Sequence, residues 1–502
     1  MTMPRRGAFS AHARGTQGDS GVRRTDAWLS LCAVAAASVI ALPVGISGQN
    51  PAPASTGPPT VTAAQGAAQP PPAPSFPAPK PRPRVIATTD GEIDDRDSMI
   101  RFLMYSNEWD VEAIIYNSSR FHWLGNTWSG VEWIHAEIDW YSRVYANLRQ
   151  HAEGYPTPDE LRSKVYVGNI NNVGEMELDT PGADRIVRVL LDDRPGPVYL
   201  QVWGGTNTVA KALSTIQKQY PDQIEKVNQK AVLFIILDQD ETFRKYIEPN
   251  WPKLQVLGSF RQFGVLAYGW RSLMPPEQRV FFERPWMEGH ITNHHGPLAG
   301  AYETNNGSFR SEGDSPSFMH QIDVGLRSLE NPAYGGWGGR FIQEKPGATN
   351  VWKEAEDDGS IYKPIWRWAA AFQQDWAARA DWSVKSYREA NHPPVVALGG
   401  PLDVDVTSGA TLKLDLSAST DPDGDQLRYS WWQYREPGTF KGDVAIRNAG
   451  PGIAEVQIPA NAAPGQTVHL IGEVTDSGKP SLTRYSRVIA TVRTASKPSN
   501  AR

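Results

Sequence analysis

Five acidic residues lie within a short stretch near position 90: Asp90, Glu92, Asp94, Asp95 and Asp97. Carboxylates at this spacing repel one another unless a cation lies among them. An environment made only of oxygen atoms suits hard divalent cations such as Ca²⁺. The alternative is a solvated loop before a helix, because acidic side chains in a first helical turn complement the helix dipole.

The elements on either side of the acidic stretch favour a site. Residues 85–88 form an apolar run rich in strand-forming residues, and Met99, Phe102 and Leu103 then recur at helical spacing. A second apolar run at 111–116 completes a strand–helix–strand unit. In open α/β sheets ligands bind beyond the carboxyl ends of the strands, which is where the acidic turn lies.

Similar patterns extend this unit over residues 84–391, and they predict a doubly wound, mostly parallel α/β sheet. The expected strands are 165–169, 197–203, 231–237 and 254–257, and the expected helices are 181–191, 208–216 and 366–382. The run 231–237 is almost wholly apolar, as in a central parallel strand covered on both faces. The turn 204–207, Gly-Gly-Thr-Asn, needs glycine for backbone reasons whether or not a site exists.

Residues 392–502 show a different pattern, in which short strands are separated by regular turns. Strands are expected at 411–416, 427–434, 454–458, 467–474 and 487–492, which predicts an all-β, immunoglobulin-like sandwich. The turn 421–425, Asp-Pro-Asp-Gly-Asp, could bind Ca²⁺ or simply supply good turn chemistry. Trp431 and Trp432 must face opposite sides of their strand. The outward one, with Tyr434, is a candidate to stack on a polysaccharide, and a structural role beside the partner domain is the alternative.

The amino terminus predicts export. Residues 1–48 contain a basic region, an apolar segment and then small residues, which is typical of a secretory signal cleaved near Gly48. We therefore expect a secreted or periplasmic bacterial protein with no membrane span after cleavage; an uncleaved anchor helix is the alternative. The Pro- and Ala-rich residues 49–83 predict a disordered tether. The single cysteine, Cys32, lies in the signal, so cleavage would leave no disulfide and no thiolate catalysis.

The charge balance excludes one class of partner. The chain has 50 Lys and Arg residues against 55 Asp and Glu residues. It therefore lacks the excess of basic residues that binding to a nucleic acid polymer would favour. Its 18 tryptophans are suited to stacking on sugar rings, although large cores use tryptophan as well. The expected partner is a sugar-containing small molecule or a polysaccharide, and a homo-oligomer is compatible with the sequence.

The acidic stretch resembles the amino-terminal signature of the inosine-uridine nucleoside hydrolases, Asp-x-Asp-x-Gly-x-Asp-Asp. Asp90 matches the second Asp, and Asp94-Asp95 matches the final pair. Thr88 stands where the family has its first Asp, and Glu92 stands where it has Gly.

Two later segments resemble the same family. The turn 204–207 is similar to the family's Gly-x-Leu-Thr-Asn segment, where the carbonyl before the glycine ligates calcium; Val202 or Trp203 would be the counterpart. The segment 314–318, Asp-Ser-Pro-Ser-Phe, is similar to its His-Asp-Pro motif, with Gly313 in place of the histidine. Asp314 could instead be a plain helix N-cap.

The resemblance implies a set of roles. Asp90, Asp95 and Asp314 would hold Ca²⁺, and Asp90 would also take the proton of a water bound to that ion. Asp94 would hold a sugar hydroxyl. The further candidates for substrate contact are Asn117, His122 and Glu312. In the family the histidine before the final Asp can protonate the leaving base, and the candidates to replace it here are Glu312, His290, His294 and His295.

The whole arrangement resembles the exported bacterial proteins described as cellulose-binding Sde182-like, which join a nucleoside hydrolase-like domain to an immunoglobulin-like domain. Two functions follow from this resemblance. The first is Ca²⁺-dependent hydrolysis of an N-glycosidic or related glycosidic bond. The second is non-catalytic binding of cellulose or another carbohydrate, which the departures at Thr88, Glu92 and Gly313 favour.

Overall fold

The computed structural model describes residues 82–494, and its larger part is built on an eight-stranded sheet with the order β3-β2-β1-β4-β5-β6-β8-β7. All neighbouring strands run parallel except β7 and β8. The strands are β1 (Arg84–Thr89), β2 (Asp110–Tyr116), β3 (Val165–Val167), β4 (Val198–Val202), β5 (Ala231–Ile236), β6 (Gln255–Ser259), β7 (Phe341–Gln343) and β8 (Val351–Glu354). The prediction of a mostly parallel α/β sheet is confirmed.

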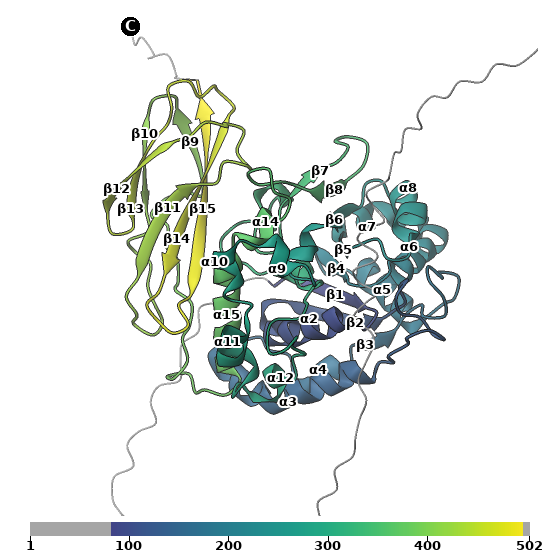
Figure 1. The fold of residues 1–502 in the computed structure, drawn as a ribbon. Coiled ribbons are helices and arrows are strands. Elements are labelled where there is room, and N and C mark those ends of the chain that lie inside the picture. The colour runs from purple at the N-terminus through teal and green to yellow at the C-terminus, as the bar shows by residue number, and fades with distance from the viewer. Residues whose placement is uncertain (1–81, 495–502) are drawn as a thin grey trace, which may run out of the picture. The chain divides into compact units, whose positions relative to one another are not determined.

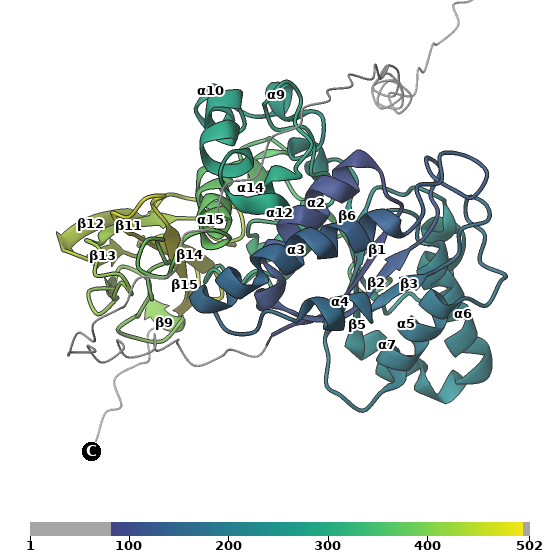
Figure 2. The same ribbon diagram turned by 90° about the horizontal axis from the view of Figure 1, so that it is seen from below.

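Helices cover both faces of this sheet (Figures 1 and 2). One face packs against α2 (Ile93–Met104), α3 (Glu132–His151) and α15 (Ala369–Trp382), and the other packs against α5 (Pro181–Leu191), α6 (Asn207–Gln219) and α7 (Ile224–Lys230). Strand side chains alternate between the two layers, so Val85 and Ala87 join the first core and Ile86 joins the second. This double cover explains why β1 is buried along its whole length.

Short helices fill the connections. They are η1 (Ser106–Glu108), α4 (Pro158–Arg162), η2 (Pro221–Gln223), η3 (Phe243–Ile247), α8 (Glu248–Asn250), η4 (Gln262–Val265), α9 (Trp270–Leu273), α10 (Pro276–Arg279), α11 (Arg284–Met287), η5 (Glu288–Thr292), α12 (Gly296–Gly300), α13 (Ser315–Met319), η6 (Pro332–Tyr334) and α14 (Lys363–Trp366). Most of the later ones lie in the aromatic-rich segment between β6 and β7.

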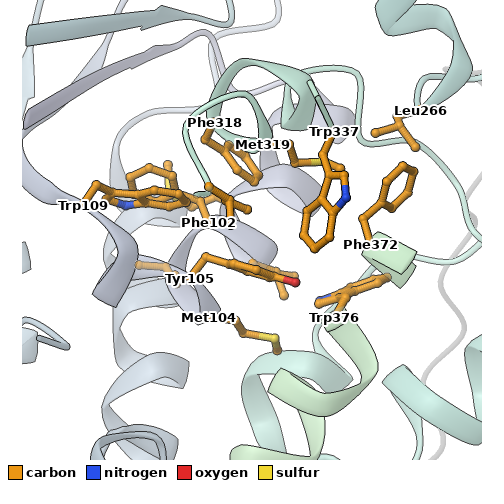
Figure 3. Close-up of a cluster of buried hydrophobic side chains, with 14 of the residues drawn as sticks. Phe102, Met104, Tyr105, Trp109, Leu266, Phe318, Met319, Trp337, Phe372 and Trp376 are labelled. Carbon is orange, nitrogen blue, oxygen red and sulfur yellow. The ribbon is translucent and has the colours of Figure 1, made fainter. Parts of the chain in front are cut away.

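An aromatic cluster fixes α2, the helix that carries the acidic stretch (Figure 3). Phe102 stacks on Trp109 with ring centroids 5.0 Å apart and meets Phe318 of α13 edge-on at 5.7 Å. Phe372 and Trp376 of α15 belong to the same buried cluster. Because rings packed in this way leave little freedom, α2 is held in a defined place relative to α13.

The carboxyl-terminal part is an all-β sandwich, as predicted. Its two sheets have the orders β10-β13-β12 and β11-β14-β15-β9. The strands are β9 (Asp403–Thr407), β10 (Thr411–Asp415), β11 (Arg428–Gln433), β12 (Ala445–Gly450), β13 (Ile453–Gln457), β14 (Thr467–Thr475) and β15 (Thr483–Arg493). Val456, Leu470 and Val488 are among the residues of the core between the sheets.

One sheet of the sandwich shares a core with the α/β part. Tyr434, Ile471 and Tyr485 pack within the same buried cluster as α2 and α15. Tyr434 is fully buried and donates a hydrogen bond from its hydroxyl to Asp357 at 2.6 Å. Tyr434 therefore has the structural role that was the alternative, and it cannot stack on a polysaccharide. The bounds 84–391 and 392–502 remain our proposed domain limits.

The predicted signal segment 1–48 and nearly all of the predicted tether 49–83 lie outside the described residues. Within residues 82–494, no helix is both long enough and apolar enough to cross a membrane.

Candidate active site

The carboxyl ends of β1, β2 and β4 meet at one edge of the sheet. Asp90 follows β1, Asn117 follows β2, and Gly204 comes shortly after β4. β1 lies between β2 and β4, where the chain changes direction across the sheet, and such switch points form the ligand-binding crevice of open α/β sheets.

A tight turn brings the first helical turn of α2 back onto the end of β1. Gly91 adopts a φ of +81°, which only glycine takes without strain. The hydroxyl of Thr89 donates to Asp95 Oδ1 at 2.5 Å, and the backbone N–H of Asp90 donates to the same oxygen at 3.1 Å. These bonds anchor Asp95 next to Asp90.

A third segment adds Asp314 to this acidic turn. Carboxylate oxygens of Asp94, Asp95 and Asp314 all lie within 4.8 Å of one another, and the three side chains are buried. Asp314 occupies the N-cap position of α13, but its side chain makes no capping hydrogen bond. A capping role therefore does not explain its carboxylate. Asp90 is fully buried and lies beside this set of three.

Burial makes these carboxyl groups hard to ionise. It raises the pKa of Asp90 to about 8, and the Glu92 carboxylate adds to this rise. Burial also raises the pKa of Asp94 to about 7, with the neighbouring Asp95 carboxylate contributing. The pKa values of Asp95 and Asp314 lie well above the usual range, first because of burial and then because of the adjacent carboxylates. A cation among these groups would reverse these shifts.

The donor set fits a hard divalent cation. Buried oxygens of Asp90 (Oδ2), Asp94 (Oδ1) and Asp314 (Oδ2) have no hydrogen-bond partner, and neither has the Oδ1 of Asn117. Buried oxygens without partners are costly unless a ligand satisfies them. We expected Asp90, Asp95 and Asp314 to be the metal ligands; the oxygens that converge belong to Asp94, Asp95 and Asp314.

Two glycines allow this convergence. A Cβ atom at Gly204 would lie 2.8 Å from the Cβ of Asp90 and 3.1 Å from the Oδ1 of Asn117. A Cβ atom at Gly313 would lie 2.5 Å from Asp94 Oδ2. A side chain at position 313 would therefore collide with the carboxylate of Asp94.

The loop after β5 holds the turn that follows β4. Gln239 donates its side-chain N–H to the carbonyl of Trp203 at 2.5 Å, so one of the two candidate backbone ligands already has a partner. Asp240 accepts hydrogen bonds from the Thr206 hydroxyl at 3.1 Å and the Asn207 backbone at 2.8 Å. We did not predict a role for Gln239 or Asp240 from the sequence. The one feature that could have indicated a role is that acidic residues follow the apolar run 231–237.

Asn117 and His122, which were also predicted to contact the substrate, both follow β2. Asn117 lies at the site, where its amide N–H donates to the carbonyl of Gly205 at 2.6 Å. His122 lies on the same loop with a buried Nδ1 that has no partner, and burial, followed by the charge of Arg96, lowers its pKa to about 4. A histidine with this pKa is neutral at pH 7 and cannot serve there as a proton donor in its charged form.

Glu312 has a different environment. Its two carboxylate oxygens accept hydrogen bonds from Arg101 of α2 at 2.5 and 3.0 Å, and the Ser315 hydroxyl donates at 2.7 Å. These contacts tie the start of α13 to α2, and we assign Glu312 to that positioning role.

His295 pairs with Asp381 of α15 at 3.2 Å. His290 packs on Trp286 with ring centroids 5.1 Å apart. Both histidines thus make their contacts among the helices.

Comparisons with known proteins agree with this architecture. The family model described as the nucleoside hydrolase-like domain of cellulose-binding Sde182 matches residues 84–341, just over half of the chain. The model described as the C-terminal domain of cellulose-binding protein Sde0182 matches residues 411–492. A search of curated proteins gives no match.

A solved structure from Saccharophagus degradans, described as a nucleoside hydrolase-related hypothetical protein associated with carbohydrate metabolism, is 32% identical to this chain. The match covers 82% of this chain and 100% of that one, with a TM-score of 0.70. A plant nucleoside hydrolase is 11% identical, with coverages of 61% and 99% and a TM-score of 0.33. An inosine-guanosine nucleoside hydrolase is 12% identical, with coverages of 60% and 98% and a TM-score of 0.28, and TM-scores this low carry no weight for function. The chain therefore belongs to the Sde182-like family, whose members carry a nucleoside hydrolase-like domain.

Proposed function

We propose that this protein is a Ca²⁺-dependent hydrolase of an N-glycosidic or related glycosidic bond. The observation that carries the proposal is the convergence of the buried Asp94, Asp95 and Asp314 carboxylates at the end of β1, with Asp90 beside them. The nucleoside hydrolase-like fold of the family supports the same reaction class.

Asp95 and Asp314 would hold the cation, together with Asp94 or Asp90. The all-oxygen, carboxylate-rich set suits Ca²⁺. When bound, such a cation lowers the pKa of a coordinated water and so supplies a nucleophile near neutral pH.

Asp90 is the proposed base. Its Oδ1 accepts the backbone N–H of Glu92 at 3.3 Å, whereas its buried Oδ2 has no partner and is open to accept a proton. The free Oδ1 of Asn117 borders the same space beside Gly204 and would accept a sugar hydroxyl. Hydroxyl contacts that strengthen as positive charge develops at the anomeric carbon contribute to the rate of such reactions.

The test is turnover of nucleosides and nitrophenyl glycosides by the full chain in Ca²⁺ and after chelation. We expect Asp90→Asn to lower kcat by about 10²- to 10⁴-fold, the usual contribution of a general base. Asp314→Asn should weaken Ca²⁺ binding measured by calorimetry. The exposed Asp443 provides the matched control, since Asp443→Asn should change neither quantity. Ca²⁺ binding at this site with no turnover of any such substrate would overturn the proposal.

Carbohydrate binding without catalysis is the second candidate. A groove of about 480 Å³ on the sandwich is lined by Tyr429 and Trp431, and aromatic faces suit sugar rings. The family description as cellulose-binding also favours it. We expect Trp431→Ala to reduce retention on cellulose, whereas the exposed aromatic control Tyr220→Ala should not. Equal retention of wild type and Trp431→Ala would remove the groove from consideration.

We further propose that the chain is exported and that its signal is cleaved near Gly48. The basic and apolar composition of residues 1–48 supports this proposal. Amino-terminal sequencing of the protein recovered outside the cytoplasm tests it, and a mature protein that starts at Met1 would contradict it.

A further inference from the structure

A second group of carboxylates lies in the sandwich, away from the carboxyl end of β1. Oxygens of Asp421, Asp423 and Asp425, all in the turn before β11, lie within 4.8 Å of one another. The Oδ1 of Asp421 accepts the backbone N–H groups of Asp423 at 2.9 Å and Asp425 at 3.1 Å. Its Oδ2 is buried and has no partner.

The turn after β14 provides an independent sign of a ligand. Asp476 is fully buried; its Oδ1 accepts the backbone N–H groups of Gly478 and Leu482 at 3.0 and 2.9 Å, but its Oδ2 has no partner. Burial raises the pKa of the Asp476 carboxyl to about 6, and the nearby Asp421 carboxylate adds to the rise. The hydroxyl of Ser477 donates to Asp425 at 3.1 Å, which holds the two turns together.

The linker between the two parts of the protein supplies another free oxygen. Asn391 is buried, and its amide N–H donates to the carbonyl of Pro480 at 2.7 Å. Its Oδ1 has no partner. A Cβ atom at Gly478 would lie 2.2 Å from the Asn391 amide, so glycine is required for this close approach.

The acidic turn is also connected to the α/β part. Asp423 accepts the backbone N–H of His392 at 2.7 Å, and the Nδ1 of His392 lies 3.0 Å from the other carboxylate oxygen. The Nε2 of His392 lies 3.0 Å from the Nδ1 of His151, the last residue of α3. The rings of His151 and Trp382, at the end of α15, stack at 5.2 Å. A continuous path of contacts thus runs from the acidic turn through His392 and His151 to α3 and α15.

We propose that Asp421, Asp423, Asp425 and Asp476, with the Oδ1 of Asn391, bind one Ca²⁺ ion that latches the sandwich to the α/β part. Without the ion, the carboxylates of Asp421, Asp423 and Asp425 lie close together, and buried oxygens of Asp421 and of the nearby Asp476 have no partner. With it, the turn is fixed, and His392 is held against α3. The all-oxygen set and the loop setting suit Ca²⁺ better than Mg²⁺, which demands a near-ideal octahedron.

Hydrogen exchange on the full chain tests the latch. Added CaCl₂ should slow exchange of the backbone amides in residues 388–396 and 421–426 in wild type, and should not do so in Asp476→Asn. This substitution keeps the Oδ1 that accepts the two backbone bonds, so folding is preserved while charge is lost. Calorimetry should show one fewer Ca²⁺ bound per chain in Asp476→Asn.

Two further variants separate this site from the candidate active site. Asp95→Asn should retain the Ca²⁺-dependent protection of residues 388–396 and 421–426, and Asp443→Asn serves as a charge control on the sandwich. In chelator, Asp476→Asn should melt no lower than wild type, because the substitution removes the repulsion between the Asp476 and Asp421 carboxylates. In Ca²⁺ it should melt lower than wild type. Protection that is absent in wild type, or that survives in both Asp476→Asn and Asp421→Asn, would overturn the latch.

Discussion

Asp90 and Asp94 are carboxyl groups held in a buried place where ionisation is unfavourable unless a cation compensates. Burial raises the pKa of Asp90 from 3.8 to about 8 and that of Asp94 to about 7. A carboxyl whose pKa is higher in the folded than in the unfolded state stabilises the fold below its unfolded pKa, and this contribution is lost as pH rises through the folded value. We therefore expect the melting temperature of the chelated protein to fall between about pH 4 and about pH 8.

Scanning calorimetry at several pH values measures this effect. Because Ca²⁺ binds the ionised carboxylates, its addition should raise the melting temperature more at about pH 8 than at about pH 5. Asp90→Asn, which removes one titrating group, should flatten the dependence seen in chelator. A chelated protein whose stability rises over the same range would contradict this account.

Position 313 is a sharper test of the site's geometry. Gly313→His would introduce the first residue of the His-Asp-Pro motif that residues 314–318 resemble, yet its Cβ would lie 2.5 Å from Asp94 Oδ2. We expect the displaced carboxylate to weaken Ca²⁺ binding by about 10- to 100-fold, the range seen when the support of a metal ligand is lost. Gly289→His, at an exposed position with open space around it, is the matched control. Increased turnover with unchanged Ca²⁺ affinity in Gly313→His would contradict this prediction. It would show that the Asp94 carboxylate can move without weakening Ca²⁺ binding.

Spacing alone indicated the residues that meet at the site but not how they share its roles. Asp90, Asp94 and Asp95 follow one strand, and strand ends of parallel sheets gather at one edge. The meeting of Asp94 with Asp314 depends on contacts between segments far apart in the chain, such as that of Gly313 with Asp94. The bond from Gln239 to the Trp203 carbonyl has the same origin. No local pattern encodes contacts of this kind.

At the scale of elements, a buried ion pair ties α13 to α2. Arg101 and Glu312 form it with both side chains almost fully buried. Removing one partner leaves an uncompensated buried charge, which costs about 3–5 kcal/mol. We expect Glu312→Ala to lower stability by about this amount and also to weaken Ca²⁺ binding, because Asp314 loses its support.

Denaturant unfolding and calorimetry check both parts of this prediction. Lys245→Ala breaks an exposed pair with Glu241 and should change stability by less than about 1 kcal/mol. If Glu312→Ala lost stability but bound Ca²⁺ with the affinity of wild type, the ion pair would not be needed to position α13 and Asp314.

The predicted elements follow periodicity well where the pattern is simple. The stripe Trp368, Phe372, Trp376 and Ala380 is buried, as helical spacing predicted. The long helix α3 was missed, although Ile134, Ile138, Tyr141 and Leu148 recur at helical spacing and are buried. The outward role expected for Tyr434 failed because alternation along a strand gives two faces but does not say that one of them is covered by another part of the chain.

At the scale of the whole molecule, the core shared by the sandwich and the α/β part makes them one folding unit. Asp357 is fully buried and accepts hydrogen bonds from Arg340 and Arg367 at 2.8 Å each and from Tyr434 of the sandwich at 2.6 Å. Arg484 of β15 pairs with Asp375 of α15 at 2.7 Å. A sandwich cut off at the linker would expose Tyr434 and Tyr485 to water, so we expect the isolated fragment to be unstable.

Tyr434→Phe tests this coupling with the smallest possible change. The substitution removes one hydrogen bond to a buried carboxylate, for which the cost is about 1.5–3 kcal/mol. Because the shared core makes the sandwich and the α/β part unfold together, calorimetry of wild type should show one transition, and Tyr434→Phe should move that transition down as a whole. Tyr429→Phe, in the groove-lining strand β11 that ends just before Tyr434, is the matched control and should leave the transition in place. Two separate transitions in wild type, or a shift confined to one of them in Tyr434→Phe, would mean that the sandwich is stable without its partner and that the Ca²⁺ latch joins two independent bodies.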